Sequence, residues 1–243
     1  MKMWSEIKGK GESLLMLHPG GADSRAFGSI EPMLSDRFTL HYIDRRAHGR
    51  TEDVDGPLHF DDMVNDFIEY IDAEVGKPVN VFGYSDGAIA ALLLTIKRPD
   101  LIKKVVCAAG VYHYKGWQDG VLESLSTAPD FMKQSYGEVS PDGIDHYAIV
   151  VSKMYIMHQS EPALTEDELQ SFYNQCLVIV ADDDEVKLEH AIKWYRSLRN
   201  GELSIMPGTS HGMFAEKPEL FSRVLIDFYD NSPIQTFAPR LRK

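Results

Sequence analysis

One short stretch of this chain could supply a nucleophile. Residues 83–87 read Gly-Tyr-Ser-Asp-Gly and lie between an apolar run at 78–82 and a helix-forming apolar run at 88–94. A serine hydroxyl attacks effectively when it stands on a sharp turn beside a base, and flanking glycines permit such a turn. The strand–turn–helix setting favours a nucleophile elbow centred on Ser85. The alternative is a structural turn in which Ser85 only caps the helix.

A nucleophilic serine needs a general base, and the chain has nine histidines. His211 is the strongest candidate, because residues 207–212, Pro-Gly-Thr-Ser-His-Gly, follow the last strand-like run and precede the last helix-like run. The two glycines would let this loop direct an imidazole back over the strand ends. The alternative is an ordinary surface histidine.

The base in turn needs a carboxylate that holds its tautomer and stabilises the imidazolium. Residues 181–185 read Ala-Asp-Asp-Asp-Glu and follow a strand-like run at 177–180. Parallel α/β sheets bind ligands at this carboxyl edge, so one aspartate can orient His211 while the others cap the turn or face solvent. A calcium site is a weak rival, because the spacing is not that of a calcium loop. The three residue types occur in the chain order Ser, Asp, His, which a catalytic triad built on a nucleophile elbow requires.

A reacting carbonyl also needs hydrogen-bond donors for its developing oxyanion. Residues 18–21 read His-Pro-Gly-Gly and follow the strand-like run 14–17. We expect the backbone N–H groups of Gly20 and Asp86 to form this oxyanion hole, because consecutive glycines allow close approach of a substrate. Gly21 and Tyr84 are further candidates for substrate contact. Alternatively, the glycines form only a loop before a helix.

Strand-like and helix-like runs alternate along the chain. The strand-like runs are at 14–17, 39–43, 79–82, 104–108, 177–180 and 203–206, and amphipathic helical patterns lie at 61–71, 189–198 and 218–229. This alternation predicts an α/β fold whose mostly parallel sheet carries helices on both faces.

The alternation stops between residues 112 and 175, where no strand is evident. A structureless loop of that length is improbable in a compact domain, and aromatic residues such as Phe131 and Tyr136 favour burial. We therefore predict a small helical lid at 112–175, inserted into a core formed by 1–111 and 176–243. Residues 232–243 are expected to form a mobile tail.

Composition limits the possible partners and location. Of 243 residues, 44% are hydrophobic and 26% charged, as in an ordinary globular protein. The net charge of −12 argues against nucleic acid and anionic membranes as partners. No apolar run reaches the length of about 20 residues that spans a bilayer, and the N-terminus lacks a secretory signal pattern. Cys107 and Cys176 lie in apolar runs and are expected to be buried thiols, which fits a cytoplasmic protein.

These motifs together resemble the α/β-hydrolase superfamily over nearly the whole chain. The resemblance rests on residues 18–21, 44–51, 83–87, 181–184 and 208–211, which occur in the family's order. Two departures stand out: His18-Pro19 replaces the usual His-Gly, and Ala181 replaces the glycine of the usual Gly-x-x-Asp. The resemblance identifies Asp184 as the triad acid, with Asp182 as the second choice.

The elbow itself is similar to that of the biphenyl-hydrolase-like amino-acid-ester hydrolases. In that group the aspartate after the serine pairs with a substrate amine, so the resemblance implies that the side chain of Asp86 could anchor an ammonium group. The alternative is that Asp86 is a carboxylate favoured by the positive end of the helix dipole.

The resemblance implies a serine hydrolase that cleaves a small ester through an acyl-enzyme on Ser85, without metal or cofactor. Aromatic and methionine side chains in the lid suggest an apolar acyl or alcohol group of modest size. The partner would be a small-molecule substrate, and the protein a monomer or homodimer. Hydrolysis of a carbon–carbon bond, a peroxide-using side reaction and a non-catalytic receptor for small ligands are alternatives on the same fold.

Overall fold

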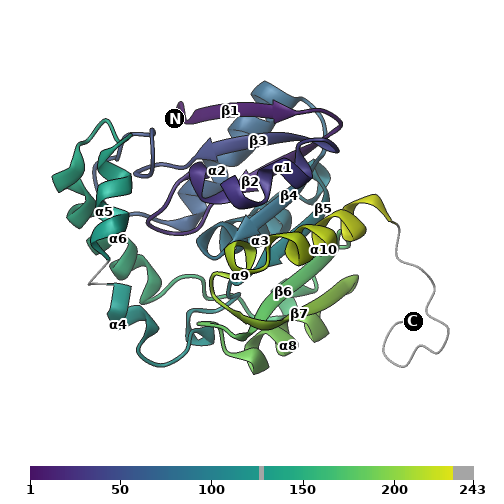
Figure 1. Cartoon of the computed structure of the whole chain (residues 1–243). Helices are drawn as coiled ribbons and strands as arrows, with labels where there is room; N and C mark the ends of the chain where they lie inside the picture. Colours follow the sequence, from purple (N-terminus) through teal and green to yellow (C-terminus); the bar gives the residue numbers. More distant parts are fainter. Residues whose placement is uncertain (126–128, 232–243) are drawn as a thin grey trace.

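The computed structural model describes residues 1–125 and 129–231. In this part of the chain seven strands form one sheet in the order β1-β3-β2-β4-β5-β6-β7, and Figure 1 shows how the sheet runs through the molecule. β1 is antiparallel to β3, and all other neighbouring strands are parallel. The bounds are Trp4–Gly9 (β1), Glu12–Leu17 (β2), Phe38–Asp44 (β3), Val79–Tyr84 (β4), Ile102–Ala108 (β5), Gln175–Asp183 (β6) and Gly201–Ser210 (β7). The predicted fold class is confirmed.

The strands β2 to β7 match the six runs expected from the sequence, and the apolar side chains of β2 to β6 are buried on both faces of the sheet. In β4, Val79 and Val81 belong to one buried layer, whereas Phe82 and Tyr84 belong to the other. Successive side chains of a strand point to opposite faces, so a strand buried on both sides reads as a continuous apolar run. β1 has no such run, since most of its side chains are exposed on the edge of the sheet.

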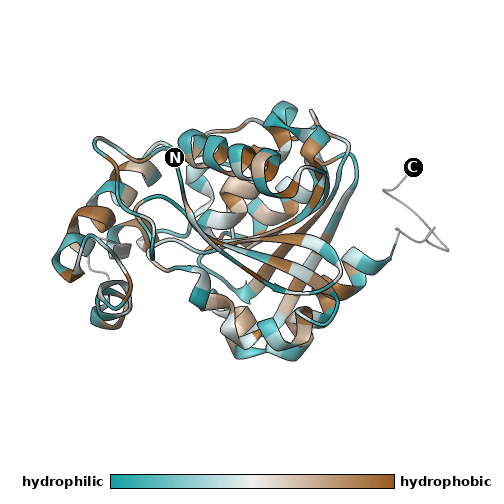
Figure 2. Ribbon diagram, turned by 90° about the horizontal axis from the view of Figure 1, so that it is seen from above, coloured by the Kyte–Doolittle hydropathy of each residue, from teal (hydrophilic) through white to brown (hydrophobic). Residues whose placement is uncertain are grey.

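Helices cover both faces of the sheet, as Figure 2 shows. One layer is formed by α2 (Phe60–Tyr70), α3 (Asp86–Lys97) and α8 (Leu188–Ser197), whose buried side chains share one apolar cluster. The other contains α1 (Glu31–Leu34), α9 (Met213–Glu216) and α10 (Pro218–Asp230). The helices predicted at 61–71, 189–198 and 218–229 thus end within two residues of the observed bounds. Among the described residues no helix is long and apolar enough to cross a bilayer.

The segment between β5 and β6 is helical. It contains α4 (Val121–Leu125), α5 (Asp130–Gly137), α6 (Tyr147–His158) and α7 (Glu166–Leu169), with no strand among its described residues. Figure 1 shows α4, α5 and α6 grouped beside one end of the sheet. Tyr147 and Met154 are buried in the same layer as α2 and α3. The expected burial of Phe131 is wrong: its side chain is 71% exposed, because α5 buries only Tyr136.

The division into a core at 1–111 and 176–243 and a lid at 112–175 stays a prediction. The tail predicted at 232–243 lies outside the described residues.

The polar residues of interest follow directly on parallel strands. His18 comes after β2, Arg45 after β3, Ser85 after β4, Asp184 after β6 and His211 after β7. Parallel strands end at the same edge of a sheet, so residues far apart in sequence meet there.

Candidate active site

Ser85 occupies a strained turn between β4 and α3. Its φ of 54° and ψ of −118° lie in a region that L-amino acids rarely adopt. The neighbouring glycines make this turn possible, because a Cβ on Gly83 would lie 2.1 Å from the carbonyl oxygen of Gly87. A Cβ on Gly87 would lie 2.0 Å from the carbonyl oxygen of Leu17. Both positions therefore exclude any side chain, which explains the glycine spacing around the serine.

The hydroxyl of Ser85 lies beside His211. The distance from Ser85 Oγ to His211 Nε2 is 3.1 Å, although the two residues are far apart in the sequence. His211 follows the last residue of β7, and its own carbonyl oxygen accepts a hydrogen bond of 2.5 Å from the hydroxyl of Tyr84. The strand ends and this bond hold the imidazole over the serine.

This contact also corrects one expectation. The side chain of Tyr84 is almost fully buried, with its ring packed edge-on against Phe214 on the sheet face occupied by α10. Because side chains alternate between the two faces along β4, the ring of Tyr84 points into the core. It therefore supports the loop of His211 and does not face a substrate.

The three consecutive aspartates have three different environments. Asp184 Oδ1 lies 2.7 Å from His211 Nδ1, and the same carboxylate accepts hydrogen bonds from the N–H groups of Ala181 and Val186. Asp182 instead accepts from the N–H groups at 208 and 209 and so ties β6 to the end of β7. Asp183 is exposed. The structure therefore brings Asp184, and not Asp182, to His211.

The electrostatic setting favours the protonated form of His211. Burial lowers the pKa of the imidazole, but the hydrogen bond and negative charge of Asp184 outweigh burial, so the pKa is raised above its ordinary value of 6.5. Glu185 adds to this effect, with its carboxylate 3.6 Å from His211 Nε2. Because an ionised carboxylate only accepts hydrogen bonds, the neutral ring carries its proton on Nδ1 and offers Nε2 as an acceptor to the hydroxyl of Ser85.

The loop after β2 is held against the elbow by Arg45. The N–H of Arg45 donates to Nε2 of His18 at 3.1 Å, and its guanidinium donates to the carbonyl oxygen of His18 at 2.9 Å. Burial and the charge of Arg45 lower the pKa of His18 to about 3, so its ring stays neutral and donates through Nδ1 to the carbonyl oxygen of Pro19. A second guanidinium nitrogen contacts Asp86 at 3.0 Å. Arg45 thus connects the two backbone segments that carry the N–H groups of Gly20 and Asp86.

Gly20 and Asp86 are in close contact. A Cβ on Gly20 would lie 2.5 Å from Asp86 Oδ2, so a side chain at position 20 would displace the carboxylate of Asp86. The N–H of Asp86 is the first of α3 and has no partner within the helix. Gly21 has a φ of 66°, and its carbonyl oxygen accepts a hydrogen bond of 3.1 Å from the hydroxyl of Tyr147 in α6. The loop at 18–21 therefore lies between the elbow and the helical insertion.

The carboxylate of Asp86 is not open to a substrate amine. Its Oδ2 binds Arg45, and its Oδ1 lies 2.9 Å from Nε2 of His158 at the end of α6. Burial alone would raise the pKa of this carboxyl, but the charges of His158 and Arg45 reverse the effect and hold the pKa far below 3.8. The expected ammonium anchor is corrected: an internal cation already occupies that position.

Three residues near the elbow were not identified from the sequence. Arg45 lies within one of the motifs, but its spacing gives no sign that its side chain turns inward. His158 and Trp117 come from opposite ends of the insertion, and the ring of Trp117 lies 6.1 Å from that of His211 and 5.9 Å from that of His158. Only the packing of the insertion brings them to the elbow.

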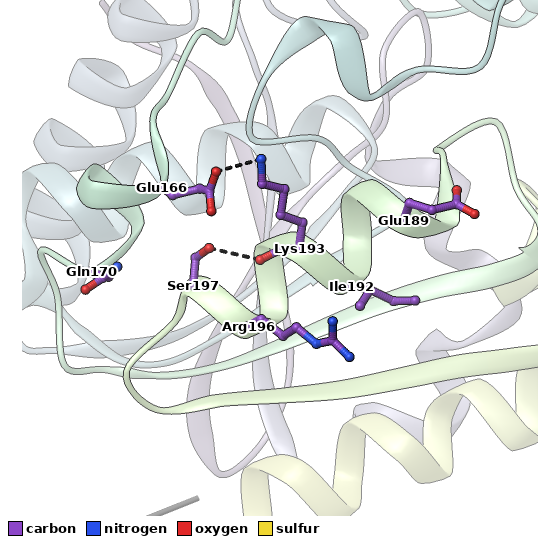
Figure 3. A pocket seen from close by; sticks show the side chains of 7 residues that line it. All are labelled: Glu166, Gln170, Glu189, Ile192, Lys193, Arg196 and Ser197. Atoms are coloured by element: carbon purple, nitrogen blue, oxygen red, sulfur yellow. Dashed lines mark hydrogen bonds and ion pairs between the residues drawn. The ribbon is translucent and has the colours of Figure 1, made fainter. Parts of the chain in front are cut away.

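A separate hollow of about 540 Å³ lies between α7 and α8, and Figure 3 shows the side chains that line it. They are Glu166, Gln170, Glu189, Ile192, Lys193, Arg196 and Ser197. An ion pair of 2.6 Å between Lys193 and Glu166 crosses the hollow, and its acidic and basic side chains balance. It contains none of the residues at the strand ends.

Comparisons with known proteins show the family to which the chain belongs. The sequence model of the alpha/beta hydrolase family matches residues 14–224. The chain is 35% identical to serine hydrolase BPHL of Mus musculus, over 90% of this chain and 80% of that protein. It is 21% identical to the pimeloyl-acyl carrier protein methyl ester esterase of Nitrosospira multiformis, over 94% of this chain and 98% of the esterase.

Solved structures share the fold at low sequence identity. The meta-cleavage product hydrolase of Pseudomonas fluorescens superposes with a TM-score of 0.77 at 15% identity, over 94% of both chains. The enol-lactonase of Burkholderia xenovorans superposes with a TM-score of 0.75 at 17% identity, over 94% of this chain and 96% of that one. The family model that matches residues 14–224 and the 35% identity to BPHL show that the chain belongs to the alpha/beta hydrolase family and is a hydrolase, as the sequence motifs indicated.

Proposed function

We propose that this enzyme hydrolyses small carboxylic esters through an acyl-enzyme on Ser85. The observation that carries the proposal is the continuous relay from Ser85 Oγ to His211 Nε2 at 3.1 Å and from His211 Nδ1 to Asp184 Oδ1 at 2.7 Å. A hydroxyl, an imidazole and a buried carboxylate in this order are the parts that acyl transfer requires.

In the first half of the reaction, Ser85 Oγ attacks the ester carbonyl while His211 accepts its proton. The raised pKa of His211 makes the ring a ready acceptor, and Asp184 stabilises the imidazolium that forms. The backbone N–H groups of Gly20 and Asp86 stabilise the oxyanion. The imidazolium then gives its proton to the departing alcohol.

In the second half, water attacks the acyl group on Ser85 and His211 again accepts and returns a proton. This mechanism uses no metal or cofactor. The segment 112–175 acts as a lid that shapes the space for the substrate, supported by the contact of Tyr147 with Gly21. The buried free thiols Cys107 and Cys176 support a cytoplasmic location.

Two relatives that match about nine-tenths of the chain favour an ester bond, since the Nitrosospira multiformis and Nitrosomonas europaea proteins are named as methyl ester esterases. The similarity to the meta-cleavage product hydrolase concerns the fold alone at 15% identity. We therefore place ester cleavage before cleavage of a carbon–carbon bond.

The proposal is tested with a fluorophosphonate probe and with p-nitrophenyl acetate. Wild type should be labelled and should hydrolyse the ester, whereas Ser85→Ala should do neither. Ser197→Ala is the matched control, because this serine lies in the hollow of Figure 3 and, within the described part of the chain, donates to the carbonyl oxygen of Lys193. An unlabelled wild type, or label that persists in Ser85→Ala, would contradict the proposal.

A further inference from the structure

One carboxylate beside the reacting atoms has no part in the relay of Ser85, His211 and Asp184. Glu185 follows Asp184 directly, and one of its carboxylate oxygens lies 3.6 Å from Nε2 of His211. This nitrogen faces Ser85, whereas Asp184 contacts the other nitrogen of the ring. Glu185 therefore places a negative charge at the nitrogen that exchanges protons with the reacting groups.

The carboxylate of Glu185 is open to solvent. Its side chain is 48% exposed and that of His211 is 23% exposed, whereas the side chain of Asp184 is fully buried. Within the described part of the chain, the ion pair that Glu185 forms is this contact with His211. A charged group of a substrate can therefore approach Glu185 without displacing a lysine or an arginine.

The backbone on both sides of Glu185 is fixed. The N–H of Gln118 donates to the carbonyl oxygen of Glu185 at 2.7 Å. The next residue, Val186, donates its N–H to the carboxylate of Asp184 at 3.2 Å. Only the side-chain torsions of Glu185 are left free, so its charge stays in the neighbourhood of His211.

The charges around the imidazole of His211 have one sign. The strongest of them are negative and belong to Asp184, Glu185 and Asp86. Asp184 is bound to the imidazole itself, and Asp86 is bound to Arg45. Glu185 is thus the member of this set that a substrate can meet.

The distances indicate which half of the substrate meets this charge. In the proposed reaction Nε2 of His211 gives its proton to the leaving oxygen of the ester, so these two atoms come within about 3 Å of each other. With the side chains as they lie in the structure, the leaving oxygen is then at most about 7 Å from the carboxylate of Glu185, whatever the orientation of the substrate. A cation two carbons beyond that oxygen can lie closer still.

We propose that Glu185 is a specificity-determining residue that favours esters whose alcohol part carries a cation, such as esters of quaternary amino alcohols. The inference rests on the proposed function and adds a substrate class to it. Opposite charges about 5 Å apart at a half-exposed site attract each other enough to change a rate by about 3–10-fold. A neutral group of the same shape gains nothing from the carboxylate.

The test compares acetylcholine with 3,3-dimethylbutyl acetate, in which a tert-butyl group replaces the trimethylammonium group. The two esters share their acyl group and have nearly the same shape, so they differ mainly in the charge of the alcohol. The readout is the charge ratio, which is the kcat/KM of acetylcholine divided by that of the neutral ester. Comparing this ratio between enzyme variants cancels the different chemical reactivity of the two esters.

Glu185→Gln removes the charge and keeps the size of the side chain. We expect it to lower the charge ratio by about 3–10-fold, with the loss falling on acetylcholine. Glu189→Gln is the matched control, because it removes the same charge from a side chain that lines the hollow of Figure 3. Its charge ratio should stay within about twofold of wild type, because salt screens distant surface charges.

A second measurement follows the charge ratio of wild type as the salt concentration rises from about 0.01 M to about 0.5 M. The ratio should fall, because the Debye length shrinks below the distance between the two charges. A residue that only supported the fold would not give this dependence on salt. If Glu185→Gln does not fold, Glu185→Ala takes its place.

The inference is overturned if Glu185→Gln leaves the charge ratio unchanged, if both esters lose rate equally, or if the ratio does not respond to salt. An equal fall in Glu189→Gln also overturns it, because the net charge of the protein would then explain the preference. So does a wild type that cleaves p-nitrophenyl acetate but not acetylcholine. In each of these cases the proposed function stands as long as Ser85 is labelled by the fluorophosphonate. A wild type that cleaves no ester and is not labelled overturns the proposed function and this inference with it.

Discussion

Two aspartate–histidine pairs flank Ser85, and they differ in what surrounds them. Asp184 lies 2.7 Å from His211 and is held by two backbone N–H groups at the end of β6. Asp86 lies 2.9 Å from His158, beneath the helical insertion, and is also bound by Arg45. The first pair lies at strand ends of the sheet, whereas the second connects the start of α3 to the end of α6.

In each pair one ring nitrogen of the histidine faces the aspartate, and the partner of the other ring nitrogen decides what the pair can do. Nε2 of His211 faces the hydroxyl of Ser85 at 3.1 Å, so this pair can move a proton. Nδ1 of His158 is buried and has no partner among the described residues, so this pair can only hold a ligand or hold the fold. The comparison teaches that a carboxylate beside an imidazole is a general base only where the second nitrogen reaches a reacting group.

The largest difference between the pairs is expected in turnover. His211→Ala should lower kcat for ester hydrolysis by about 10⁴–10⁶-fold, because both proton transfers pass through this ring. His158→Ala should lower kcat by less than about 10²-fold, since no proton passes through it. Steady-state kinetics on p-nitrophenyl acetate measure both effects. The double variant Ser85→Ala, His211→Ala should lose little more kcat than either single variant, because the two residues act as a unit. Equal losses in His211→Ala and His158→Ala would contradict the difference between the two pairs.

The next effect concerns the carboxylate that orients the base. Asp184→Asn should lower kcat by about 10³–10⁴-fold, because the amide cannot hold the Nδ1–H tautomer or stabilise the imidazolium. Asp182→Asn should stay within several-fold of wild type, since Asp182 binds backbone N–H groups of β7 and not His211. Single-turnover acylation rates in the two variants provide the measurement, and a larger loss in Asp182→Asn would show that the other aspartate orients the histidine.

The second pair is expected to contribute strongly to the free energy of unfolding. Asp86→Asn leaves the buried guanidinium of Arg45 without its counter-charge, which should lower the free energy of unfolding by about 3 kcal/mol. The control Asp61→Asn removes an exposed pair with Lys97 and should cost less than about 1 kcal/mol. Urea denaturation at pH 7 measures both, and equal costs would contradict the view that Asp86 is the counter-charge of the buried Arg45.

The same carboxyl predicts a dependence of stability on pH. The pKa of Asp86 is lower in the folded than in the unfolded state, so its contribution is complete above the ordinary value of 3.8 and is lost as the pH falls towards the folded value. The stability difference between wild type and Asp86→Asn should therefore shrink in strongly acidic solution.

The smallest expected effect is a shift of the pH–rate profile. His211 must be neutral to accept a proton, and its pKa is raised, so kcat/KM should increase with pH and reach half of its maximum above pH 6.5. Asp184→Asn should move this midpoint down, because it removes the charge that raises the pKa. His158→Gln should leave the midpoint unchanged, and a shift of equal size in that variant would show that the two pairs titrate together.

Much of the first pair could be predicted from the sequence. Ser85, Asp184 and His211 each follow a strand-like run, and parallel strands end at one edge of the sheet. Their meeting is thus a consequence of local patterns combined with one rule of sheet topology. The choice of Asp184 needed the family resemblance, because the three neighbouring aspartates are equivalent by residue type alone.

The second pair, Asp86 and His158, could be recognised only from the tertiary structure. Nothing in the local sequence indicates that Arg45 turns inward, that Asp86 is already paired, or that Trp117 and His158 meet beside His211. These contacts depend on how the helical segment between β5 and β6 packs against the rest of the chain, and that packing joins residues from different elements without a repeating pattern. The sequence by itself determined the fold class and indicated the candidate reacting groups, because strand patterns and chain order are local properties. The surroundings of the reacting groups were decided by long-range packing, which no local pattern records.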